Sequence, residues 1–305
     1  MDNTSVMAYL HGDGAIKLEF STSVDSIDIT GEPIPADNRK KTEWLQNIAL
    51  RYGGHKVENE LDIPKAGYCI ATSDHPFLDM SEGMEARIKD AQIMAGYVAS
   101  DSYPSVYLEL PHDETYQLED AADLTIDELR NSARCRLSAM ISGSFGVRRH
   151  QATYHDPMTG YHQVELVKKS VPSGGSRHPS ELFLEVHASP VLSTGIWHFN
   201  TRRGELQRVS SAPLSKAPVS DADWIIGIAV ASVVRRAMFR YRDPRSFRAI
   251  LVDAGHAEAQ LEAIANFCNW RYRSGVAIDF DFTTHIGLGK DEVPVLIRGL
   301  LEGWE

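Results

Sequence analysis

Apolar residues recur every three or four positions in several stretches of the chain, which is the pattern of helices that bury one face. In Leu129–Phe145 this spacing turns Leu137, Met140 and Ile141 inward. Thr125 and Glu128 precede this stretch with the spacing of a capping box, so we expect the helix to begin there. Helices are predicted over Lys41–Arg51, Met84–Val98, Leu129–Phe145, Ala222–Phe239 and His256–Trp270.

Other stretches alternate apolar and polar residues or form short apolar runs between turn residues, and both patterns indicate strands. Strands are predicted at Tyr103–Pro111, in two polar segments of Arg148–Lys169 that turn at Gly160, and at Ser180–His187, Gly195–Asn200, Ala249–Asp253 and Val293–Arg298. Asp25–Lys41 is predicted to be a loop and His112–Asp123 a linker. Helices and strands mix without a regular βαβ period, which favours an α+β fold with a mixed or antiparallel sheet over a doubly wound one.

The composition is that of an ordinary globular protein, with 43% apolar and 24% charged residues among 305. The charge, however, divides the chain. Residues 1–127 hold nine Lys and Arg against 24 Asp and Glu, a net charge of −15, whereas residues 128–305 hold 22 against 18, a net charge of +4. We therefore expect an acidic N-terminal region of unassigned role at residues 1–120 and a second domain at 121–305. Neither part is basic enough for a general nucleic-acid binder.

Cysteine usage and hydropathy predict a soluble cytoplasmic protein without a membrane anchor. Cys69, Cys135 and Cys268 are single, which argues against a disulfide framework or a structural zinc site and fits a reducing compartment. The N-terminus shows no basic segment before an apolar one, so no signal peptide is expected. The longest apolar run, Trp224–Val234, is shorter than the roughly 18 residues of a membrane span.

Several common signatures of enzyme sites are absent from the sequence. It contains no G-x-G-x-x-G after a strand, no G-x-x-x-x-G-K-[ST] and no G-x-S-x-G, which argues against Rossmann, P-loop and α/β-hydrolase sites. His178 and Glu181 superficially offer two metal ligands, but Pro179 and the following strand are incompatible with a helical zinc motif, so no metal site is expected.

Two segments carry residues typical of a ligand site. In Lys168–Pro179, basic residues precede a Pro-Ser-Gly-Gly turn whose glycines would let the backbone approach a ligand and donate its N–H groups; an ordinary surface turn is the alternative. In Arg235–His256, six arginines are interleaved with aromatic residues around Pro244. Arginine binds phosphate through two parallel hydrogen bonds, so an anion site is expected there, with single-stranded nucleic acid as a weaker alternative.

Taken together, these segments resemble the nitroreductase superfamily and, within it, the SagB-type dehydrogenases. The family pattern Pro-Ser-Gly/Ala-Gly-Ala-x-x-Pro-x-Glu-x-Tyr-Leu is matched by Pro172–Leu184, with Phe183 in place of Tyr. Further matches are Trp197–Asn200, the run from Arg240-Tyr241 to Asp253-Ala254-Gly255-His256, the strand Glu292–Ile297, and loosely Leu137–Gly146. The resemblance covers about Leu129–Gly299.

The resemblance implies an FMN-dependent α+β fold, usually a homodimer that binds FMN between its two chains. Cofactor binding is then expected from Pro172, Ser173, Gly174, Gly175, Lys169, Arg236, Arg245 and His256, with the glycine segment at the flavin ring and the basic residues at the phosphate. His178 is expected to contact the substrate or the flavin. Best-known members oxidise thiazolines and oxazolines in peptides to thiazoles and oxazoles.

One departure concerns the catalytic pair. A Lys-Tyr pair is associated with proton removal in the family, and the corresponding residues here are Arg240 and Tyr241. Arginine stays protonated and cannot act as a general base. Either Tyr241 acts as the base, or Arg240 only orients substrate carbonyls, or the reaction differs.

The sequence therefore predicts an FMN-dependent oxidoreductase that acts on a peptide or a peptide-derived natural-product intermediate, with azoline oxidation first. Reduction of dehydroamino acids or nitro groups is an alternative with the same cofactor. An FMN-less module that binds a peptide or a biosynthetic partner enzyme is the alternative outside the enzymes.

Overall fold

The computed structural model describes residues 5–10, 16–21, 83–241, 246–279, 281–288 and 293–304, and divides the chain into two compact units, Met1–Ser81 and Glu82–Glu305. In the first unit, β1 (Ser5–Leu10) and β2 (Ile16–Ser21) pair antiparallel. The predicted loop Asp25–Lys41 and helix Lys41–Arg51 lie outside the described residues.

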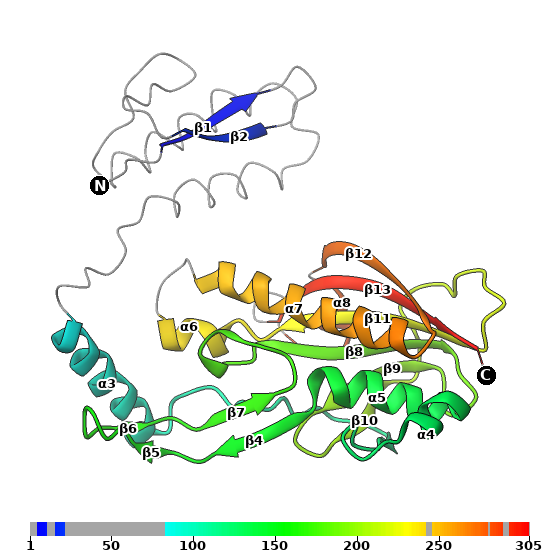
Figure 1. Cartoon of the computed structure of the whole chain (residues 1–305), viewed down its shortest axis with the longest axis horizontal. Helices are drawn as coiled ribbons and strands as arrows, with labels where there is room; N and C mark the ends of the chain where they lie inside the picture. Colours follow the sequence, from blue (N-terminus) through cyan, green and yellow to red (C-terminus); the bar gives the residue numbers. More distant parts are fainter. Residues whose placement is uncertain are drawn as a thin grey trace. The chain divides into compact units, whose positions relative to one another are not determined.

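A seven-stranded sheet forms the centre of the second unit, and every pair of neighbouring strands in it is antiparallel (Figure 1). Its order is β12 (Arg271–Asp279), β13 (Val295–Gly303), β11 (Trp224–Ser232), β8 (Ser180–Ala188), β9 (Gly195–Asn200), β10 (Glu205–Ser210) and β3 (Glu114–Gln117). The predicted pairing of the two strands now labelled β8 and β9 is confirmed, as is a strand at the position of β13.

Apolar residues cover both faces of this sheet, because successive side chains of a strand point to opposite sides. Leu182 and Leu184 of β8 face a core shared with α5 (Ala133–Phe145) and α7 (Ser246–Phe267). Phe183 faces a smaller core with Phe282 of α8 (Asp281–His285), against which Leu108 also packs. The sheet is therefore buried between layers, and its central strands are mainly apolar, with Glu181, Glu185 and His198 as buried exceptions.

A two-stranded arm extends from this body (Figure 1). Its strands are β4 (Val147–Gln151) paired with β7 (Leu166–Lys169), and β5 (Tyr154–His155) paired with β6 (His162–Gln163). The predicted turn at Gly160 is confirmed, with φ of +72°. The helix α3 (Gly83–Ser100), also predicted, contacts this arm through a 2.9 Å hydrogen bond from Gln92 Nε2 to Tyr161 Oη.

Two predictions for the apolar segments are wrong for the same reason. Ala222–Phe239 is not one helix but β11 followed by α6 (Arg235–Tyr241), and Ala249–Asp253 is not a strand but part of α7. A short apolar run cannot be assigned to helix or strand from its period alone; β11 is almost wholly buried, whereas Leu251 and Val252 are exposed on α7. The β-branched residues of β11, such as Ile226, Ile228 and Val230, are the local signal for a strand.

Three boundaries also differ from prediction. Tyr103–Pro111 forms no regular strand, although its alternating Leu108 and Leu110 pack on the smaller core. The predicted linker His112–Asp123 contains β3, which pairs with β10. The compact unit that holds the sheet accordingly begins at Glu82, whereas the sequence places a division at residue 120.

The helix predicted over Leu129–Phe145 is two helices, α4 (Ile126–Asn131) and α5, separated at Ser132. The predicted capping box is confirmed, because the Thr125 side chain accepts from the backbone N–H of Glu128 while the Glu128 carboxylate accepts from that of Thr125. Ser132 caps α5 in turn by accepting from Cys135 N. None of the described helices is long and apolar enough to cross a membrane.

Candidate active site

The glycine-rich segment forms a tight loop between β7 and β8, with a single 3-10 turn at Gly174–Ser176. Gly175, Ser176 and His178 all have positive φ, at +58°, +55° and +45°. This region is open to glycine but unfavourable for most other residues. The tight turn that the sequence predicts at Pro172–Gly175 is therefore present.

Asp253 of α7 anchors this loop through two hydrogen bonds that its carboxylate accepts. Its carboxylate accepts from Ser173 Oγ at 2.6 Å and from Gly174 N at 3.1 Å, and Ser173 Oγ itself accepts from His178 N at 2.8 Å. Burial raises the pKa of Asp253, and the two donated hydrogen bonds oppose that rise in part. The sequence gives no sign of this anchor, because its local pattern places Asp253 in a strand.

Several backbone N–H groups of this loop are hydrogen-bonded within the protein. The N–H of Gly174 is bonded to Asp253, that of Ser176 to Ser173 O and that of Arg177 to Gly174 O. Of the N–H groups of Pro172–Gly175 that the resemblance places at a flavin ring, that of Gly174 thus has a partner within the protein.

The structure brings Tyr241 to this loop. The last residue of α6, Tyr241 is partly exposed, and its hydroxyl lies 2.5 Å from the position that a Cβ on Gly175 would occupy. Only glycine at position 175 leaves room for this contact. The residue predicted as catalytic and the glycines predicted to bind a cofactor therefore form one surface.

Arg240 joins the same surface through an ion pair that the sequence did not reveal. Its Nη1 lies 2.8 Å from Oδ1 of Asp90 on α3, and its guanidinium carbon lies 5.7 Å from the centre of the Tyr241 ring. Asp90 is far from Arg240 in the sequence, so only the fold shows that they meet. The pair holds the Arg240 guanidinium beside Tyr241.

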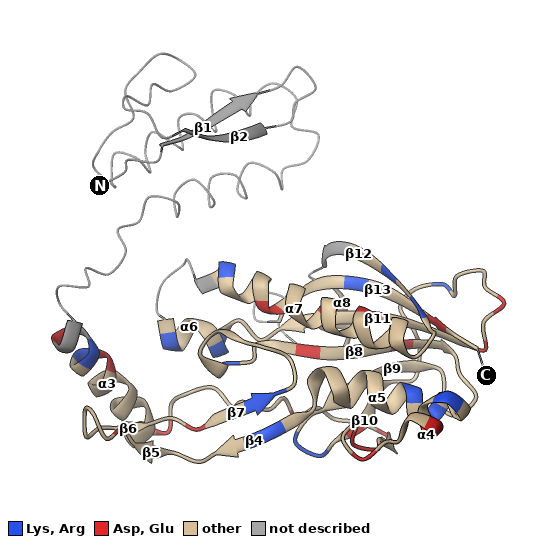
Figure 2. Cartoon of the chain, viewed as in Figure 1, with Lys and Arg blue, Asp and Glu red and all other residues tan. Residues whose placement is uncertain are grey.

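Lys169 and Arg236 instead belong to a buried cluster around Glu181 of β8. Arg236 Nη1 contacts Oε1 of Glu181, Lys169 Nζ lies 4.0 Å from the same oxygen, and His198 Nε2 lies 3.1 Å from Oε2. Figure 2 shows basic residues on β7 and α6 and acidic residues on β8, the elements that contribute to this cluster. Glu181 and the side chain of Lys169 are fully buried, and Arg236 is only 2% exposed.

The electrostatics of this cluster follow from burial. Burial lowers the pKa of Lys169 to about 8, against the opposing influence of Glu181. For Glu181, burial alone would raise the pKa, but the positive charges of Lys169 and Arg236 hold it well below its ordinary value. Because both cations are committed to Glu181, they do not fit the predicted role of phosphate ligands.

His178 is also buried. It is 4% exposed, its Nε2 accepts from Lys169 N at 3.4 Å, and its carbonyl accepts from Arg236 Nη1 at 3.0 Å. Burial and the charge of Lys169 lower the pKa of His178 to about 3, so the imidazole is neutral. It supports the loop from inside, which does not fit the predicted substrate contact.

The remaining predicted residues are exposed or lie outside the described part of the chain. Pro172 and Gly175 are exposed on the loop. His256 is exposed on α7, and its charge lowers the pKa of Asp253 slightly against the effect of burial. Arg245 lies outside the described residues. No group of three or more His, Cys, Asp or Glu side chains in the described part of the chain is placed to hold a metal ion.

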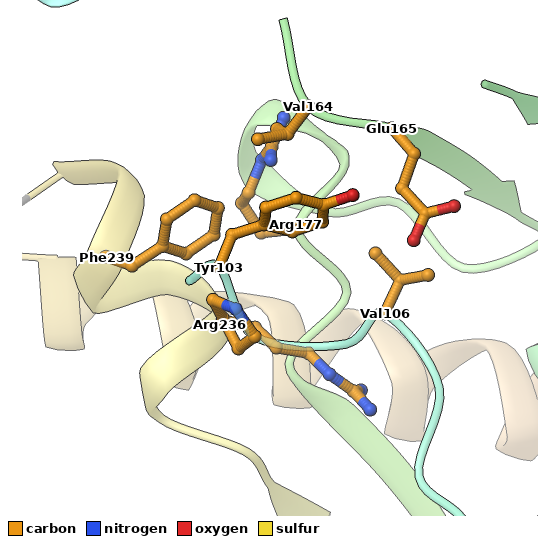
Figure 3. Close-up of a pocket in the computed structure, with 8 residues that line it drawn as sticks. Tyr103, Val106, Val164, Glu165, Arg177, Arg236 and Phe239 are labelled. Atoms are coloured by element: carbon orange, nitrogen blue, oxygen red, sulfur yellow. The ribbon is translucent and has the colours of Figure 1, made fainter. Parts of the chain in front are cut away.

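A small pocket, partly open to solvent, lies next to the loop. It is lined by Tyr103, Pro104, Val106, Val164, Glu165, Arg177, Arg236 and Phe239 (Figure 3). Small-molecule sites in proteins usually measure roughly 300–1,000 Å³. This pocket is far smaller than that, so it does not enclose a flavin nucleotide within one chain.

Comparison with solved structures finds a protein with a similar fold. A protein from Anabaena variabilis that bears the name nitroreductase matches 70% of this chain with a TM-score of 0.52 and 19% identity. The chain has a nitroreductase fold. The fold that the resemblance implies is thus confirmed, and the expected α+β class with it. The chain spans only 46% of the Anabaena protein.

Two further comparisons concern a curated protein and a solved complex. The trifolitoxin-processing protein TfxB of Rhizobium leguminosarum bv. trifolii is 26% identical over 219 residues, which cover 65% of this chain and 59% of TfxB. The E. coli microcin synthetase McbBCD complex with truncated pro-MccB17 matches 88% of this chain and 94% of the matched chain at 14% identity, but its TM-score of 0.39 is too low to establish a shared fold. No protein-family model matches the sequence.

Proposed function

We propose that this chain is an FMN-dependent oxidoreductase that modifies a peptide or a peptide-derived intermediate. Three observations support the proposal: the nitroreductase fold, the similarity to a trifolitoxin-processing protein, and the surface on which Tyr241 and Arg240 meet the glycine loop. The last of these carries the most weight, because it gathers an acid–base group and a cation at one open position.

FMN, when bound, supplies a two-electron acceptor for a hydride. The part of this chain would be to bind and orient the peptide and to move a proton. The Tyr241 hydroxyl is the only one of the predicted pair that can exchange a proton, since Arg240 stays charged. Arg240, held by Asp90, would orient a substrate carbonyl by donating to it. Of the residues predicted for the phosphate, Arg245 keeps that proposed role.

The first choice of reaction is oxidation of an azoline to an azole, in which one ring carbon loses a proton to a base, the neighbouring carbon loses a hydride to the acceptor, and a double bond forms between them. A synthetic peptide that carries a thiazoline is the substrate to test, with added FMN. Loss of two hydrogens by mass spectrometry supports the reaction. Tyr241→Phe should slow it strongly, whereas the matched variant Tyr161→Phe, at the arm, should not.

An unchanged thiazoline in the presence of bound flavin would remove azoline oxidation from the proposal. The reductive direction, on a dehydroamino acid or a nitro compound, is then the alternative for the same site. We further propose a homodimer with the flavin between two copies, in keeping with the small volume of the pocket in one chain. The mass of the purified protein in solution tests this arrangement.

One observation favours a function without FMN. Tyr241 covers Gly175, the N–H of Gly174 is bonded to Asp253, and Lys169 with Arg236 is committed to Glu181. Gly174, Gly175, Lys169 and Arg236 were each predicted to bind the cofactor. A nitroreductase-like module that binds a peptide or a partner enzyme is therefore the second candidate, and flavin content distinguishes it from the first.

A further inference from the structure

Helix α3 contacts the end of α6, the short helix that carries Tyr241. Asp90 of α3 pairs with Arg240 Nη1 at 2.8 Å, and the Tyr97 ring meets the Phe239 ring edge to face, with the ring centres 5.6 Å apart. Asp90 and Tyr97 are two helical turns apart, so both lie on one face of α3. Their partners, Arg240 and Phe239, are the two residues directly before Tyr241.

The position of α3 itself is fixed by burial on this face and by a contact on the other. Met94, which lies between Asp90 and Tyr97 on the same face, is fully buried. On the opposite side of the helix, Gln92 donates to Tyr161 Oη of the arm at 2.9 Å, and Figure 1 shows α3 beside β6. The helix α3 is therefore held between α6 and the arm.

The contacts continue from Phe239 to the glycine loop through Arg177. The guanidinium carbon of Arg177 lies 5.7 Å from the centre of the Phe239 ring, a cation–π contact, and its Nε donates to Gly175 O at 2.9 Å. Gly175 is the residue on which the Tyr241 hydroxyl rests. A continuous series of contacts thus leads from Tyr97 on α3 to the backbone beneath Tyr241.

Asp90 acts on both arginines of this surface. Arg177 is 8% exposed, and burial together with the charge of Arg240 lowers its pKa, whereas the charge of Asp90 opposes that change. Two guanidinium groups close to each other repel, and a carboxylate near both offsets the repulsion. One side chain of α3 therefore helps to keep Arg177 beside the loop and Arg240 on α6.

The helix α6 needs such support, because it has only seven residues and Tyr241 is its last. Helices shorter than about 12 residues are marginal on their own, and their ends fray. We propose that α3 positions Tyr241 on the glycine loop, with Tyr97 and Arg177 as positioning residues. The proposal rests on the proposed function, in which the Tyr241 hydroxyl moves a proton, and adds two residues to it.

NMR of the full chain, with ¹³C at the ζ carbon of its tyrosines, tests the position of Tyr241 without any need for turnover. The signal that disappears in Tyr241→Phe belongs to Tyr241. We expect Tyr97→Ala to shift this signal, because the edge-to-face contact with Phe239 is lost. Tyr97→Phe keeps the ring and should leave the Tyr241 signal where it is in the natural chain.

Tyr107→Ala is the matched control. Tyr107 also makes an aromatic contact, with its ring centre 5.2 Å from the guanidinium carbon of Arg202, but neither residue belongs to α3, α6 or the glycine loop. This variant should leave the Tyr241 signal unchanged. Arg177→Lys keeps the charge but loses the hydrogen bond to Gly175 O, so it should also shift the signal, which preserves the test if Tyr97→Ala does not fold.

Kinetics with the thiazoline peptide distinguish positioning from a general loss of structure. Tyr97→Ala should lower kcat about tenfold or more with little change in KM, because a misplaced reacting group reacts slowly. In a chain that already carries Tyr241→Phe, the same substitution should lower kcat no further, whereas a merely structural role would lower it equally in both chains.

Two results would overturn the proposal: a Tyr241 signal that moves in neither Tyr97→Ala nor Arg177→Lys, or an equal loss of kcat with and without the Tyr241 hydroxyl. The NMR measurement requires neither flavin nor substrate. A chain that is inactive but shows the shifted signal would therefore contradict the proposed function alone, and an active chain with an unmoved signal would contradict the role of α3 alone.

Discussion

The hydroxyl of Tyr241 lies 2.5 Å from where a Cβ on Gly175 would be, so the last residue of α6 rests directly on the backbone of the glycine loop. A side chain at 175 would displace the tyrosine. This contact joins two features that are separate in the sequence, the Pro-Ser-Gly-Gly turn and the arginine-rich segment. Gly175 is therefore needed to leave room for Tyr241, whether or not this surface also binds a ligand.

Gly175→Ala should therefore lower stability and displace Tyr241. The positive φ of +58° costs about 1–2 kcal/mol for an L residue, and the clash with the hydroxyl adds to it. Gly160→Ala is the matched control, because Gly160 has a φ of +72° but no atom lies within 4 Å of the place its Cβ would take. Urea unfolding should show a larger loss for Gly175→Ala, and adding Tyr241→Phe should recover part of the difference. Equal losses in the two alanine variants would contradict the contact.

Glu181→Gln should be strongly destabilising, because it leaves Lys169 and Arg236 buried without their shared carboxylate. Breaking a buried ion pair costs about 3–5 kcal/mol. Glu109→Gln, at the exposed pair with Arg202, is the control and should change the free energy of unfolding by less than about 1 kcal/mol. A small effect of Glu181→Gln would show that the cluster does not hold β8 to α6 as described.

Stability should fall on mild acidification because of His178. Its pKa is about 3 in the folded chain against 6.5 for an ordinary histidine, so the unfolded state takes up a proton that the folded state does not. The contribution is complete above pH 6.5 and declines as the pH drops below it, by about 2 kcal/mol between pH 6.5 and 5. Asparagine tolerates the positive φ at this position, so His178→Asn is the variant to measure.

His178→Asn should flatten the dependence of unfolding free energy on pH in that range. His112→Asn, at an exposed histidine, controls for the removal of an imidazole. If the natural chain and His178→Asn show the same slope, His178 is not buried in its neutral form.

Much of the fold could be predicted where a pattern is local. The capping box at Thr125, the turn at Gly160 and the strand pair around Phe183 and His198 each depend on residues close in the sequence. The prediction was wrong at β11, where burial removes the polar face that distinguishes a helix from a strand, and at the start of α7, where the apolar run is too short for its period to decide.

The candidate site was predicted in part. The sequence motifs singled out Gly175 and Tyr241, which do meet, but could not show that Asp90 holds Arg240 or that Asp253 anchors Ser173. Ion pairs between distant segments depend on the fold. For the same reason Lys169 and Arg236, attractive as phosphate ligands in the sequence, prove to be paired with Glu181, itself a charged residue within an apolar strand.

Tyr241→Phe should separate catalysis from binding. The ring remains on the loop while the hydroxyl is lost, so flavin content should stay unchanged and the rate of substrate conversion should fall about 10²–10⁴-fold, the usual contribution of a general acid–base group. Asp90→Asn should lower the rate less, because Arg240 loses only its orienting partner. An unchanged rate in Tyr241→Phe would remove that residue from the mechanism.

The near-ultraviolet and visible absorption spectrum of the purified protein, before and after heating to release any bound ligand, tests the central claim most directly. An FMN-dependent oxidoreductase should show flavin bands that match free FMN after release, or should acquire them stoichiometrically when FMN is added. A protein that stays colourless in the presence of excess FMN would contradict the oxidoreductase account and favour the peptide- or partner-binding module.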